Sequence, residues 1–427
     1  MIATALITLL ALMLLAIPVA AAMGVLGLVL GQMYAFLPVS RVAGEIAWTS
    51  SNEFLLVALP LFILLGELLL RSGLAEKMYE ALARWLSWLP GGLMHSNIAA
   101  CALFAATSGS SVATAATVGT VALPQSQRFG YNERLFLGSL AAGGTLGILI
   151  PPSINMIVYA VLTNTSVPRL YLAGIIPGAL LALGFMVIIS LACLWRPAWG
   201  GQRMSSSLAD CVRGLVHLVP PLGIFLVVVG SIYAGVATPT EAASLGVMAG
   251  LGLAVWNRTL KWPMLRDALL GTMKSTGMIM LIIVAAYFLN FVMSAIGLTT
   301  RLTDSVQNLG LSKWQMLFAV IVFYVILGCF METLSMMITT IPVIAPVMQT
   351  MGFDMVWFGI VVIVLVETAL ITPPVGLNLF VVHNLRKKGS MNDVMLGSLP
   401  FVAAMFVLLL ALALFPGLAL WLPGVLS

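Results

Sequence analysis

Long, uninterrupted apolar segments restrict the fold of this chain more than any other feature of its sequence. Residues 215–236 and 401–420 are two examples, and each is long enough to cross the hydrocarbon core of a bilayer as a helix. Backbone groups in lipid need internal hydrogen bonds, so only helices or closed β-barrels span a membrane. Barrel strands alternate apolar and polar residues, whereas these segments do not. The sequence therefore predicts an all-α polytopic membrane protein.

Composition excludes a water-soluble fold and several classes of function. Of the 427 residues, 61% are hydrophobic and only 8% are charged, against about a quarter charged in soluble domains. The net charge of +5 comes from basic residues that stand singly or in small groups between apolar segments, so we expect no nucleic-acid partner. The four cysteines and three histidines form no CxxC or HExxH motif, so we expect no zinc or redox centre.

The sequence contains an internal repeat. Residues 124–132 resemble residues 346–354, and the same offset of 222 residues relates Pro151-Pro152 to Pro373-Pro374. A second pair of segments has apolar residues at helical spacing, as in an amphipathic helix that lies along a membrane surface. Its members, at an offset of 224 residues, are Leu74, Met78, Leu82 and Trp85 in the first half and Leu298, Leu302, Val306 and Leu309 in the second.

Each repeat is expected to hold scaffold spans, a surface helix, a re-entrant hairpin and a proline-broken helix. Residues 1–38 are compatible with one tilted span or two short ones, and Pro18 favours two. The first repeat covers residues 1–195, with scaffold spans at 1–71 and 171–195, a surface helix at 72–90, and the hairpin and broken helix at 91–165; a cytoplasmic linker follows at 196–214. The second repeat covers residues 215–427, with scaffold spans at 215–297, a surface helix at 298–311, the hairpin and broken helix at 312–385, and a last span at 395–420.

The two repeats are expected to enter the membrane in opposite orientations, because each has five spans, an odd number. The distribution of charge agrees with this arrangement. With the N-terminus outside, 15 basic residues, among them Arg84 and Lys387, fall in cytoplasmic segments. Only 4, among them Arg169 and Arg301, fall outside. This is the positive-inside bias of membrane proteins.

Inverted repeats with broken helices are typical of secondary transporters, whose substrate binds near the bilayer midplane where the repeats meet. Polar residues interrupt both expected hairpins, at 107–111 and at 330–333, and supply the hard oxygen ligands that a small cation prefers. The breaks at 143–152 and 367–374 should present helix N-termini, each begun by its prolines, to an anion such as a carboxylate.

Structural roles compete with these interpretations. Hydroxyls in membrane helices commonly bond to their own backbone or join neighbouring helices. Glu332, at the repeat position of Ser110, would serve equally as the cap of the second hairpin arm. Glu367, at the repeat position of Thr145, is an intramembrane carboxylate, which is costly and often functional. Glu67 is expected near a span end, where its carboxylate reaches water.

Five motifs carry a family resemblance: Leu89-Pro-Gly-Gly92, Ser108-Gly-Ser-Ser-Val-Ala113, Ile150-Pro-Pro-Ser153, Ala237-Thr-Pro-Thr-Glu-Ala-Ala243 and Thr372-Pro-Pro-Val-Gly376. In this order, and over the whole chain, they resemble the large membrane subunit of tripartite ATP-independent periplasmic (TRAP) transporters. The resemblance implies sodium-coupled symport of a small organic anion across the bacterial inner membrane by an elevator mechanism, without an organic cofactor. It also implies two partners: a small four-helix membrane subunit, expected as a separate chain, and a periplasmic binding protein that delivers the substrate.

The resemblance and the helix breaks assign roles to particular residues. Thr114 stands where many relatives have an acidic residue, so no carboxylate role is expected there. The first sodium site would lie among Ser108, Gly109, Ser110, Ser111, Gly144 and Thr145, and the second among Glu332, Thr333, Thr368, Thr372 and Pro373. The expected substrate contacts, at and after the two proline pairs, are Pro152, Ser153, Asn155, Pro374 and Asn378.

Two other functions stay open at this point. A stand-alone sodium–dicarboxylate symporter of similar hairpin architecture would need no binding protein. An intramembrane hydrolase would use Ser110 or Ser111, but the nearby base would be His95 and the sequence has no nucleophile elbow, so no enzyme activity is expected. The substrate is open among C4-dicarboxylates, sugar acids and sialic acids.

Overall fold

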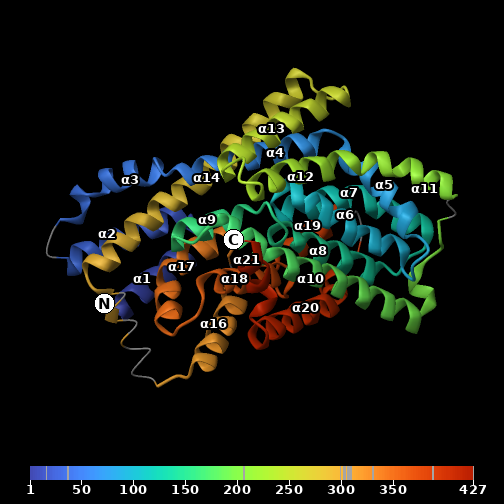
Figure 1. Ribbon diagram of the computed structural model, residues 1–427. Coiled ribbons are helices and arrows are strands. Elements are labelled where there is room, and N and C mark those ends of the chain that lie inside the picture. Colours follow the sequence, from blue (N-terminus) through green and yellow to red (C-terminus); the bar gives the residue numbers. More distant parts are fainter. Residues whose placement is uncertain are drawn as a thin grey trace.

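The computed structural model describes residues 1–15, 17–35, 38–204, 207–298, 300–301, 304, 310–328, 331–386 and 389–426, and within these ranges every regular element is a helix (Figure 1). The helices of the first half are α1 (Ile2–Leu14), α2 (Val19–Tyr34), η1 (Val39–Arg41), α3 (Ala43–Ser51), η2 (Phe54–Val57), α4 (Ala58–Arg71), α5 (Leu74–Leu86), α6 (Gly92–Ser108), α7 (Ser111–Phe129), α8 (Glu133–Leu149), α9 (Ile154–Thr163), α10 (Val167–Trp195) and η3 (Pro197–Gly200). Those of the second half are α11 (Leu208–Gly214), η4 (Leu215–His217), α12 (Val219–Tyr233), α13 (Pro239–Trp256), α14 (Trp262–Ala295), α16 (Lys313–Leu327), α17 (Thr333–Thr350), α18 (Met355–Ile371), α19 (Leu377–Leu385), α20 (Met391–Leu414) and α21 (Gly417–Leu426).

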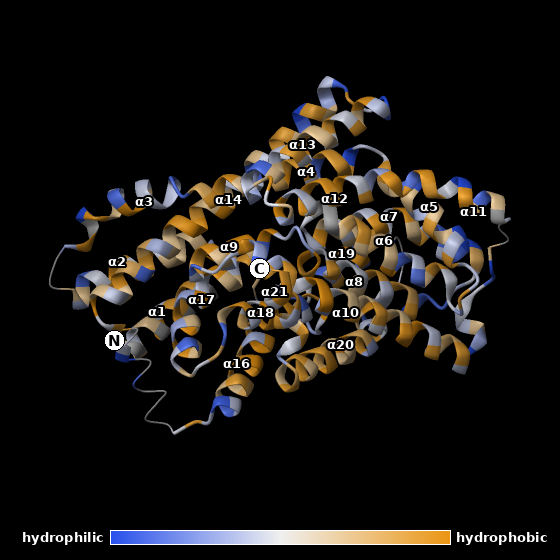
Figure 2. Cartoon of the chain, in the orientation of Figure 1, coloured by the Kyte–Doolittle hydropathy of each residue, from blue (hydrophilic) through white to orange (hydrophobic). Residues whose placement is uncertain are grey.

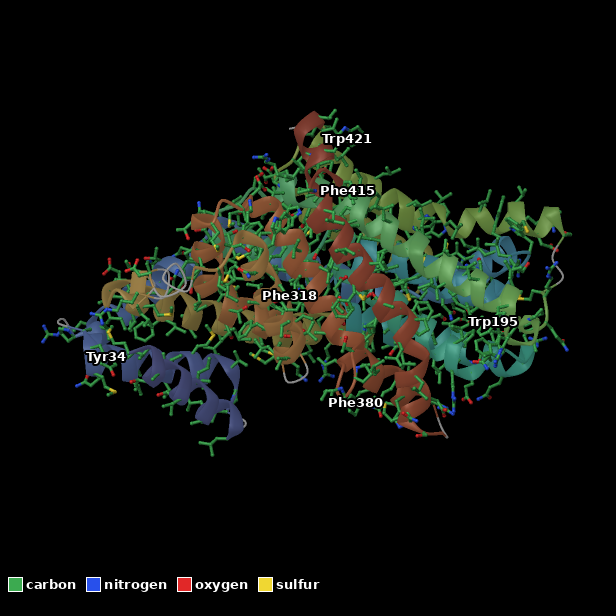
Figure 3. All side chains as sticks on the ribbon, turned by 90° about the horizontal axis from the view of Figure 1, so that it is seen from below. Tyr34, Trp195, Phe318, Phe380, Phe415 and Trp421 are labelled. Atoms are coloured by element: carbon green, nitrogen blue, oxygen red, sulfur yellow. The ribbon has the colours of Figure 1, made fainter. Side chains whose placement is uncertain are left out.

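The predicted all-α membrane protein is confirmed. In the described ranges, five helical segments are long and apolar enough to cross a bilayer: η2 with α4, α10, α14, α17 and α20. The number rises to seven if two bent helix pairs, α8 with α9 and residues 209–217 with α12, each form one span. Apolar residues cover most of the helical surface (Figure 2). Large aromatic side chains point outward, and Trp195, Phe318, Phe415 and Trp421 are between 61% and 77% exposed (Figure 3).

The first residues form two helices. α1 ends at Leu14, and α2 begins at Val19 directly after Pro18. Proline fits this position because a helix N-terminus needs no N–H donor there. This answers the question that the sequence left open over residues 1–38 in favour of a helix pair.

The apolar stripe of α5 packs inside the protein. Leu74, Met78 and Leu82 are buried, and α5 contacts α6, α7 and α11. Trp85 is 39% exposed, and its indole Nε1 donates to the carbonyl of Cys211 at 2.8 Å. The stripe packs against the first hairpin, and the expectation that this helix lies along the membrane surface stays a prediction. Of the corresponding stripe in the second half, Leu302, Val306 and Leu309 lie outside the described residues.

Helices α8 and α18 form the centre of the molecule. All residues of α8 from 135 to 149 and of α18 from 356 to 371 are buried. Helix α8 packs against α6, α7, α18 and α20, and α18 packs against α16, α17 and α20. A second set of helices packs together beside them: α14 lies against α2, α3 and α4, and α13 lies against α4 and α12 (Figure 1). We refer to α6–α9 and α16–α20 as the central group and to α2–α4 and α12–α14 as the outer group.

Both proline pairs break a helix. The next helix does not begin at the prolines, because one or more residues separate them from its first residue. α8 ends at Leu149 and α9 begins at Ile154, with 43° between them. Ile150 and Thr372, which precede the two pairs, are extended, at φ −86°, ψ 122° and φ −89°, ψ 124°. A residue before proline avoids the helical region because the proline ring clashes with it. The expectation that these prolines start the second half-helix was therefore wrong: Ser153 caps α9, and Gly376 precedes α19.

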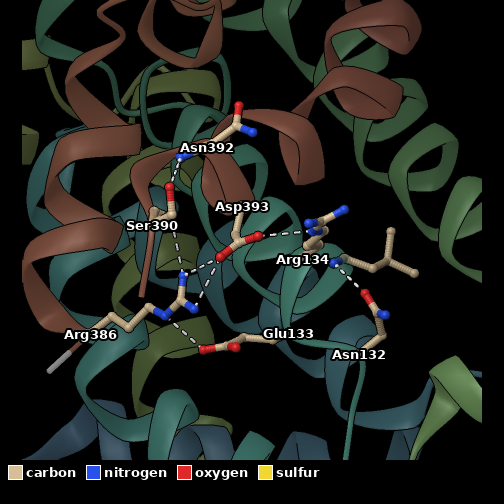
Figure 4. Close-up of polar contacts among 8 residues, drawn as sticks. Asn132, Glu133, Arg134, Arg386, Ser390, Asn392 and Asp393 are labelled. Carbon is tan, nitrogen blue, oxygen red and sulfur yellow. Dashed lines mark hydrogen bonds and ion pairs between the residues drawn. The ribbon is translucent and has the colours of Figure 1, made fainter. Parts of the chain in front are cut away.

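A cluster of ion pairs joins the ends of α8, α19 and α20 (Figure 4). The guanidinium of Arg386, only 7% exposed, lies 2.7 Å from the carboxylate of Glu133 and 3.2 Å from that of Asp393. Asp393 also accepts from Arg134 at 2.9 Å. Just beyond this cluster, α8 crosses α20. Gly138 lies against the backbone of Gly397 at this crossing, and a side chain on either glycine would collide with the other helix. The cluster and the crossing hold three helices of the central group together.

Candidate functional site

The first hairpin turns at Gly109 and Ser110. Gly109 has φ +61°, a left-handed conformation that glycine adopts without strain, and it ends α6. Ser110 caps α7, with its hydroxyl accepting from the N–H of Ala113 at 3.4 Å. A methyl group on Gly109 would lie 3.3 Å from the carbonyl oxygen of Pro152, so the tip rests on the first proline break. The side chain of Ser108 lies outside the described residues.

The second hairpin turns before Glu332, which caps α17. The Glu332 carboxylate accepts from the N–H of Ser335 at 3.1 Å and from the hydroxyl of Thr333 at 2.9 Å. The capping role that competed with ion binding is therefore present. Gly328, at the end of α16, packs directly against Ala369 of α18.

Each hairpin contacts its own broken helix at the same repeat position. In the first half, a methyl group on Gly147 would lie 3.0 Å from the carbonyl of Ser110. In the second half the contact is between Ala369 and Gly328, and Ala369 stands 222 residues after Gly147. The contact therefore recurs at the same repeat position on the broken helix, whereas on the hairpin it shifts to Gly328, four residues before Glu332, which is the repeat partner of Ser110.

A cavity of about 400 Å³ lies where the two hairpin tips meet the outer group. Six of the predicted site residues line it: Gly109, Ser110, Ser111, Asn155, Glu332 and Thr333. Its remaining walls are Ile63, Gly66, Glu67 and Leu70 of α4, Ser275, Met278 and Ile279 of α14, Val112, Ala113 and Ala116 of α7, and Ile148, Ile154, Leu334 and Leu370. The cavity is therefore bounded by both repeats and by both groups of helices.

Three predicted residues meet behind the first hairpin tip. A methyl group on Gly144 would lie 3.0 Å from the amide nitrogen of Asn378 and 3.2 Å from the carbonyl oxygen of Ser111. Asn378 donates its amide N–H to the carbonyl of Ala141 at 3.2 Å. Its Oδ1 and the Ser111 hydroxyl are buried without a hydrogen-bond partner. Asn378 was predicted as a substrate contact, and it lies beside Gly144, which was predicted for the first sodium site.

Buried oxygens without partners are unusual in native proteins, and an ordered water or a bound ion can satisfy them. Ser111 Oγ and Asn378 Oδ1 are hard neutral oxygens of the kind that bind small cations. The donor chemistry at this position therefore fits a sodium ion.

Three predicted hydroxyls bond to their own helices. Thr145 donates to the carbonyl of Ala142 at 2.7 Å, Thr368 to Val364 at 2.6 Å, and Thr372 to Thr368 at 2.6 Å. Each of these bonds uses the hydroxyl proton and leaves the oxygen lone pairs available. Pro152, Ser153, Pro373 and Pro374 belong to the helix breaks and are not among the residues that line the cavity.

The scaffold side of the cavity was missed by the sequence analysis. Glu67 was expected to reach water at a span end, but its carboxylate lines the cavity, pairs with Arg71 and lies against Gly271 of α14. The signal was a carboxylate within an apolar helix with an arginine four residues later. Ser275 of α14 gave no comparable signal, because only tertiary packing brings it to this wall.

Two other arrangements do not belong to this site. A larger cavity of about 730 Å³ is lined by Arg84, Arg128 and Arg203 and contains none of the predicted site residues. His95, the base that a hydrolase would need, lies 2.9 Å from the carbonyl of Pro90 and 3.3 Å from the hydroxyl of Ser190. It therefore pairs with α10 rather than with the serines of the hairpin tip.

Comparisons with known proteins agree with this architecture. Residues 6–418 match the family described as "Tripartite ATP-independent periplasmic transporter, DctM component". The chain is 35% identical to the C4-dicarboxylate TRAP transporter large permease protein of Pseudomonas aeruginosa, over 88% of this chain and 87% of that protein. It is 29% identical to the sialic acid TRAP transporter large permease protein of Vibrio cholerae, over 87% of each.

A solved structure with the same fold is that of the YdaH transporter of Alcanivorax borkumensis, described as having an unusual topology. The two chains share 16% identity, a TM-score of 0.57, and coverage of 96% of this chain and 99% of that one. The match of the family over almost the whole chain, and the large permeases to which it is similar, settle the assignment. This chain belongs to the family of DctM components, the large permeases of tripartite ATP-independent periplasmic transporters.

Proposed function

We propose that this chain carries a small organic anion across the inner membrane together with sodium, and that the cavity between the hairpin tips is the transport site. One observation carries the proposal: both hairpin tips and the first helix break converge on one cavity that also touches α4 and α14. Secondary transporters built from broken-helix repeats bind their substrates at such a junction.

The first sodium ion would bind behind the first hairpin tip. Ser111 Oγ and Asn378 Oδ1 are buried oxygens without partners, and both residues pack closely against Gly144. The second ion would bind at the second tip, where Glu332 and Thr333 supply oxygens, with Thr368, Thr372 and Pro373 of the second break completing the set. Sodium is held by such oxygens without a dedicated cluster of charged ligands.

The substrate anion would bind at the start of α9. The amide nitrogen of Asn155 is buried, has no hydrogen-bond partner and lines the cavity. The first N–H groups of a helix also lack partners within the helix, and they attract an anion. A carboxylate would satisfy both kinds of donor. The relatives are named for a C4-dicarboxylate and for sialic acid, which both carry carboxylates.

Transport would proceed by movement of the central group against the outer group. The cavity lies at the boundary between them, with the hairpin tips on one side and α4 and α14 on the other. Sliding of the central group along this boundary would expose the site first to one side of the membrane and then to the other. The inverted orientation of the two repeats gives this elevator movement two related end states.

The family name implies further components. A tripartite system contains two others besides this one, and we infer that they are a small membrane subunit and a periplasmic binding protein. Reconstitution tests this reading against a stand-alone symporter. We expect purified chain in liposomes to take up no C4-dicarboxylate or sialic acid under an inward sodium gradient, because delivery depends on the binding protein.

Adding both partner proteins should produce uptake with a sodium gradient, and replacing that gradient with a potassium gradient should abolish it. Uptake by the single chain would reject the tripartite assembly. Equal uptake with potassium would reject sodium coupling.

A further inference from the structure

Glu367 is a carboxylate at the centre of the molecule that the proposed ion and substrate sites leave unused. It is completely buried in α18. Among the described residues no basic side chain forms a salt bridge with it, and its Oε2 has no hydrogen-bond partner. A buried charge without a counter-charge is costly, so a carboxylate kept in this position needs a reason.

The other carboxylate oxygen reaches across to the opposite repeat. Oε1 accepts from the backbone N–H of Ile148, near the end of α8, at 3.1 Å. In a regular α-helix this N–H would donate to the carbonyl four residues earlier, which here is that of Gly144. An N–H group that donates to Glu367 forms a weaker hydrogen bond with the Gly144 carbonyl. That oxygen therefore keeps capacity for another partner.

Gly144 lies beside two residues of the proposed first sodium site. A methyl group on Gly144 would lie 3.2 Å from the backbone carbonyl oxygen of Ser111 and 3.0 Å from the amide nitrogen of Asn378. The oxygens without a partner are other atoms of these two residues, the Ser111 hydroxyl and Asn378 Oδ1. The carbonyl of Gly144 would be a third oxygen on the same short stretch of α8. The turn that follows, at Gly147, supports the Ser110 end of the hairpin tip.

We propose that Glu367 is a positioning residue for the first sodium site. It would draw the Ile148 N–H away from the Gly144 carbonyl, and its carboxylate would balance the charge of a sodium ion bound at that carbonyl. The inference rests on the proposed sodium coupling. Its new content is that a residue of the second repeat outside the proposed ligands adjusts the sodium affinity of the first site.

This contact from the second repeat to the first has no counterpart in the reverse direction at the equivalent position. Thr145 occupies the repeat position of Glu367, and its hydroxyl donates to Ala142 of its own helix rather than to the opposite repeat. Substitution of Glu367 should therefore weaken one sodium site directly and leave the Glu332 site in place.

Sodium-dependent thermal unfolding of the purified chain in detergent tests the proposal without partner proteins. A ligand that binds the folded state raises the unfolding temperature with a midpoint set by its affinity. We compare sodium chloride with choline chloride at equal ionic strength. E367Q removes the charge but keeps an acceptor oxygen. E367D keeps the charge but withdraws it from Ile148. E45Q, at an exposed position on α3, is the matched control.

Wild type and E45Q should share one sodium midpoint. E367Q should raise the sodium midpoint by about tenfold. A nearby unit charge in a protein interior changes the affinity for an ion by at least this factor. E367D should raise the midpoint as well. In choline chloride, E367Q should unfold at the wild-type temperature or above, because it removes an unbalanced buried charge.

A purely structural role for Glu367 predicts the opposite pattern, with a lower unfolding temperature in choline chloride and an unchanged sodium midpoint, and that result would overturn the inference. If E367Q does not fold, E367D decides the question alone. Absence of any sodium-specific shift in wild type would instead reject the proposed sodium coupling itself.

Discussion

At the scale of single residues, two neighbouring serines of the first hairpin tip differ in what they already bond. The hydroxyl of Ser110 accepts from the N–H of Ala113, so it caps a helix. The hydroxyl of Ser111 is buried without a partner. Removal of Ser110 would lose a cap, which is worth about 1 kcal/mol, and would mix a stability effect with any effect on ion binding. Ser111 is therefore the better residue with which to test the first sodium site.

Ser111→Ala should raise the sodium concentration needed for half-maximal uptake by about tenfold, because one oxygen ligand is lost and no other hydrogen bond changes. Thermal stability without sodium should stay at the wild-type value. The measurement is uptake by the complete reconstituted system over a sodium titration. Thr120→Ala, which removes an exposed hydroxyl bonded to its own helix at Ala116, is the control on the same helix. Equal sodium dependence in S111A, T120A and wild type would remove Ser111 from the ion site.

Residues of the hairpin tips were predictable from sequence because polar residues interrupt otherwise apolar segments. The contacts that each of these residues makes were not predictable. Asn378 was predicted as a substrate contact, but it lies against Ala141 and Gly144 because α19 packs against α7 and α8, and no spacing along the chain encodes that contact. Glu67 and Ser275 of the cavity wall were missed for the same reason. Glu367 was noticed as a costly carboxylate, but its bond to Ile148 joins residues 219 positions apart.

At the scale of elements, the ion-pair cluster of α8, α19 and α20 contains one buried and one exposed arginine. Arg386 is 7% exposed and pairs with both Glu133 and Asp393, whereas Arg134 is 59% exposed and pairs with Asp393. Buried ion pairs are costly to break because the remaining charge stays out of water. Exposed pairs contribute little. The two arginines therefore offer a matched comparison within one cluster.

Arg386→Gln should lower the free energy of unfolding by about 1.5–3 kcal/mol, because buried hydrogen bonds to a charged group are lost, and Arg134→Gln by less than about 1 kcal/mol. Thermal unfolding of the two variants in the same detergent measures the difference. Added salt should reduce the effect of R134Q more than that of R386Q, since exposed charges are screened more strongly. Equal losses in both variants would show that burial of Arg386 does not strengthen the cluster.

Helices and their breaks were largely readable from the sequence, since apolar length and prolines determine them locally. The place of each proline relative to the following half-helix was not read correctly. Pro151-Pro152 and Pro373-Pro374 end one helix by holding the preceding residue extended, and a different residue begins the next. The amphipathic helix α5 was predicted, but not what its apolar stripe contacts, because the same stripe suits a lipid surface or a protein surface and only the tertiary structure decides between them.

At the scale of the whole molecule, the chain is a multi-pass protein of the bacterial inner membrane. The distribution of basic residues predicts that its two repeats face opposite ways. Arg84, on α5, is partly buried and Arg301 is exposed, and they stand in the paired amphipathic segments of the two halves. With inverted repeats they lie on opposite sides of the membrane.

Single-cysteine labelling in intact cells tests the orientation, after the four native cysteines are replaced. A membrane-impermeant thiol reagent should label R301C and leave R84C unlabelled until the cells are permeabilised. R169C should behave like R301C and serve as a second periplasmic marker. Labelling of positions 84 and 301 from the same side would reject the inverted arrangement.

Asn155 and Asn378 are matching residues of the two repeats, and they differ in the groups that surround them. An asparagine amide presents a donor on one end and an acceptor on the other. At Asn378 the backbone of α8 occupies the donor, and at Asn155 the donor is left free. Equivalent side chains of the two repeats thus offer an oxygen in one half and a nitrogen in the other. Two equivalent asparagines can therefore prefer ions of opposite charge although the amino acid is the same. A comparison of the two repeats by sequence alone would overlook this difference.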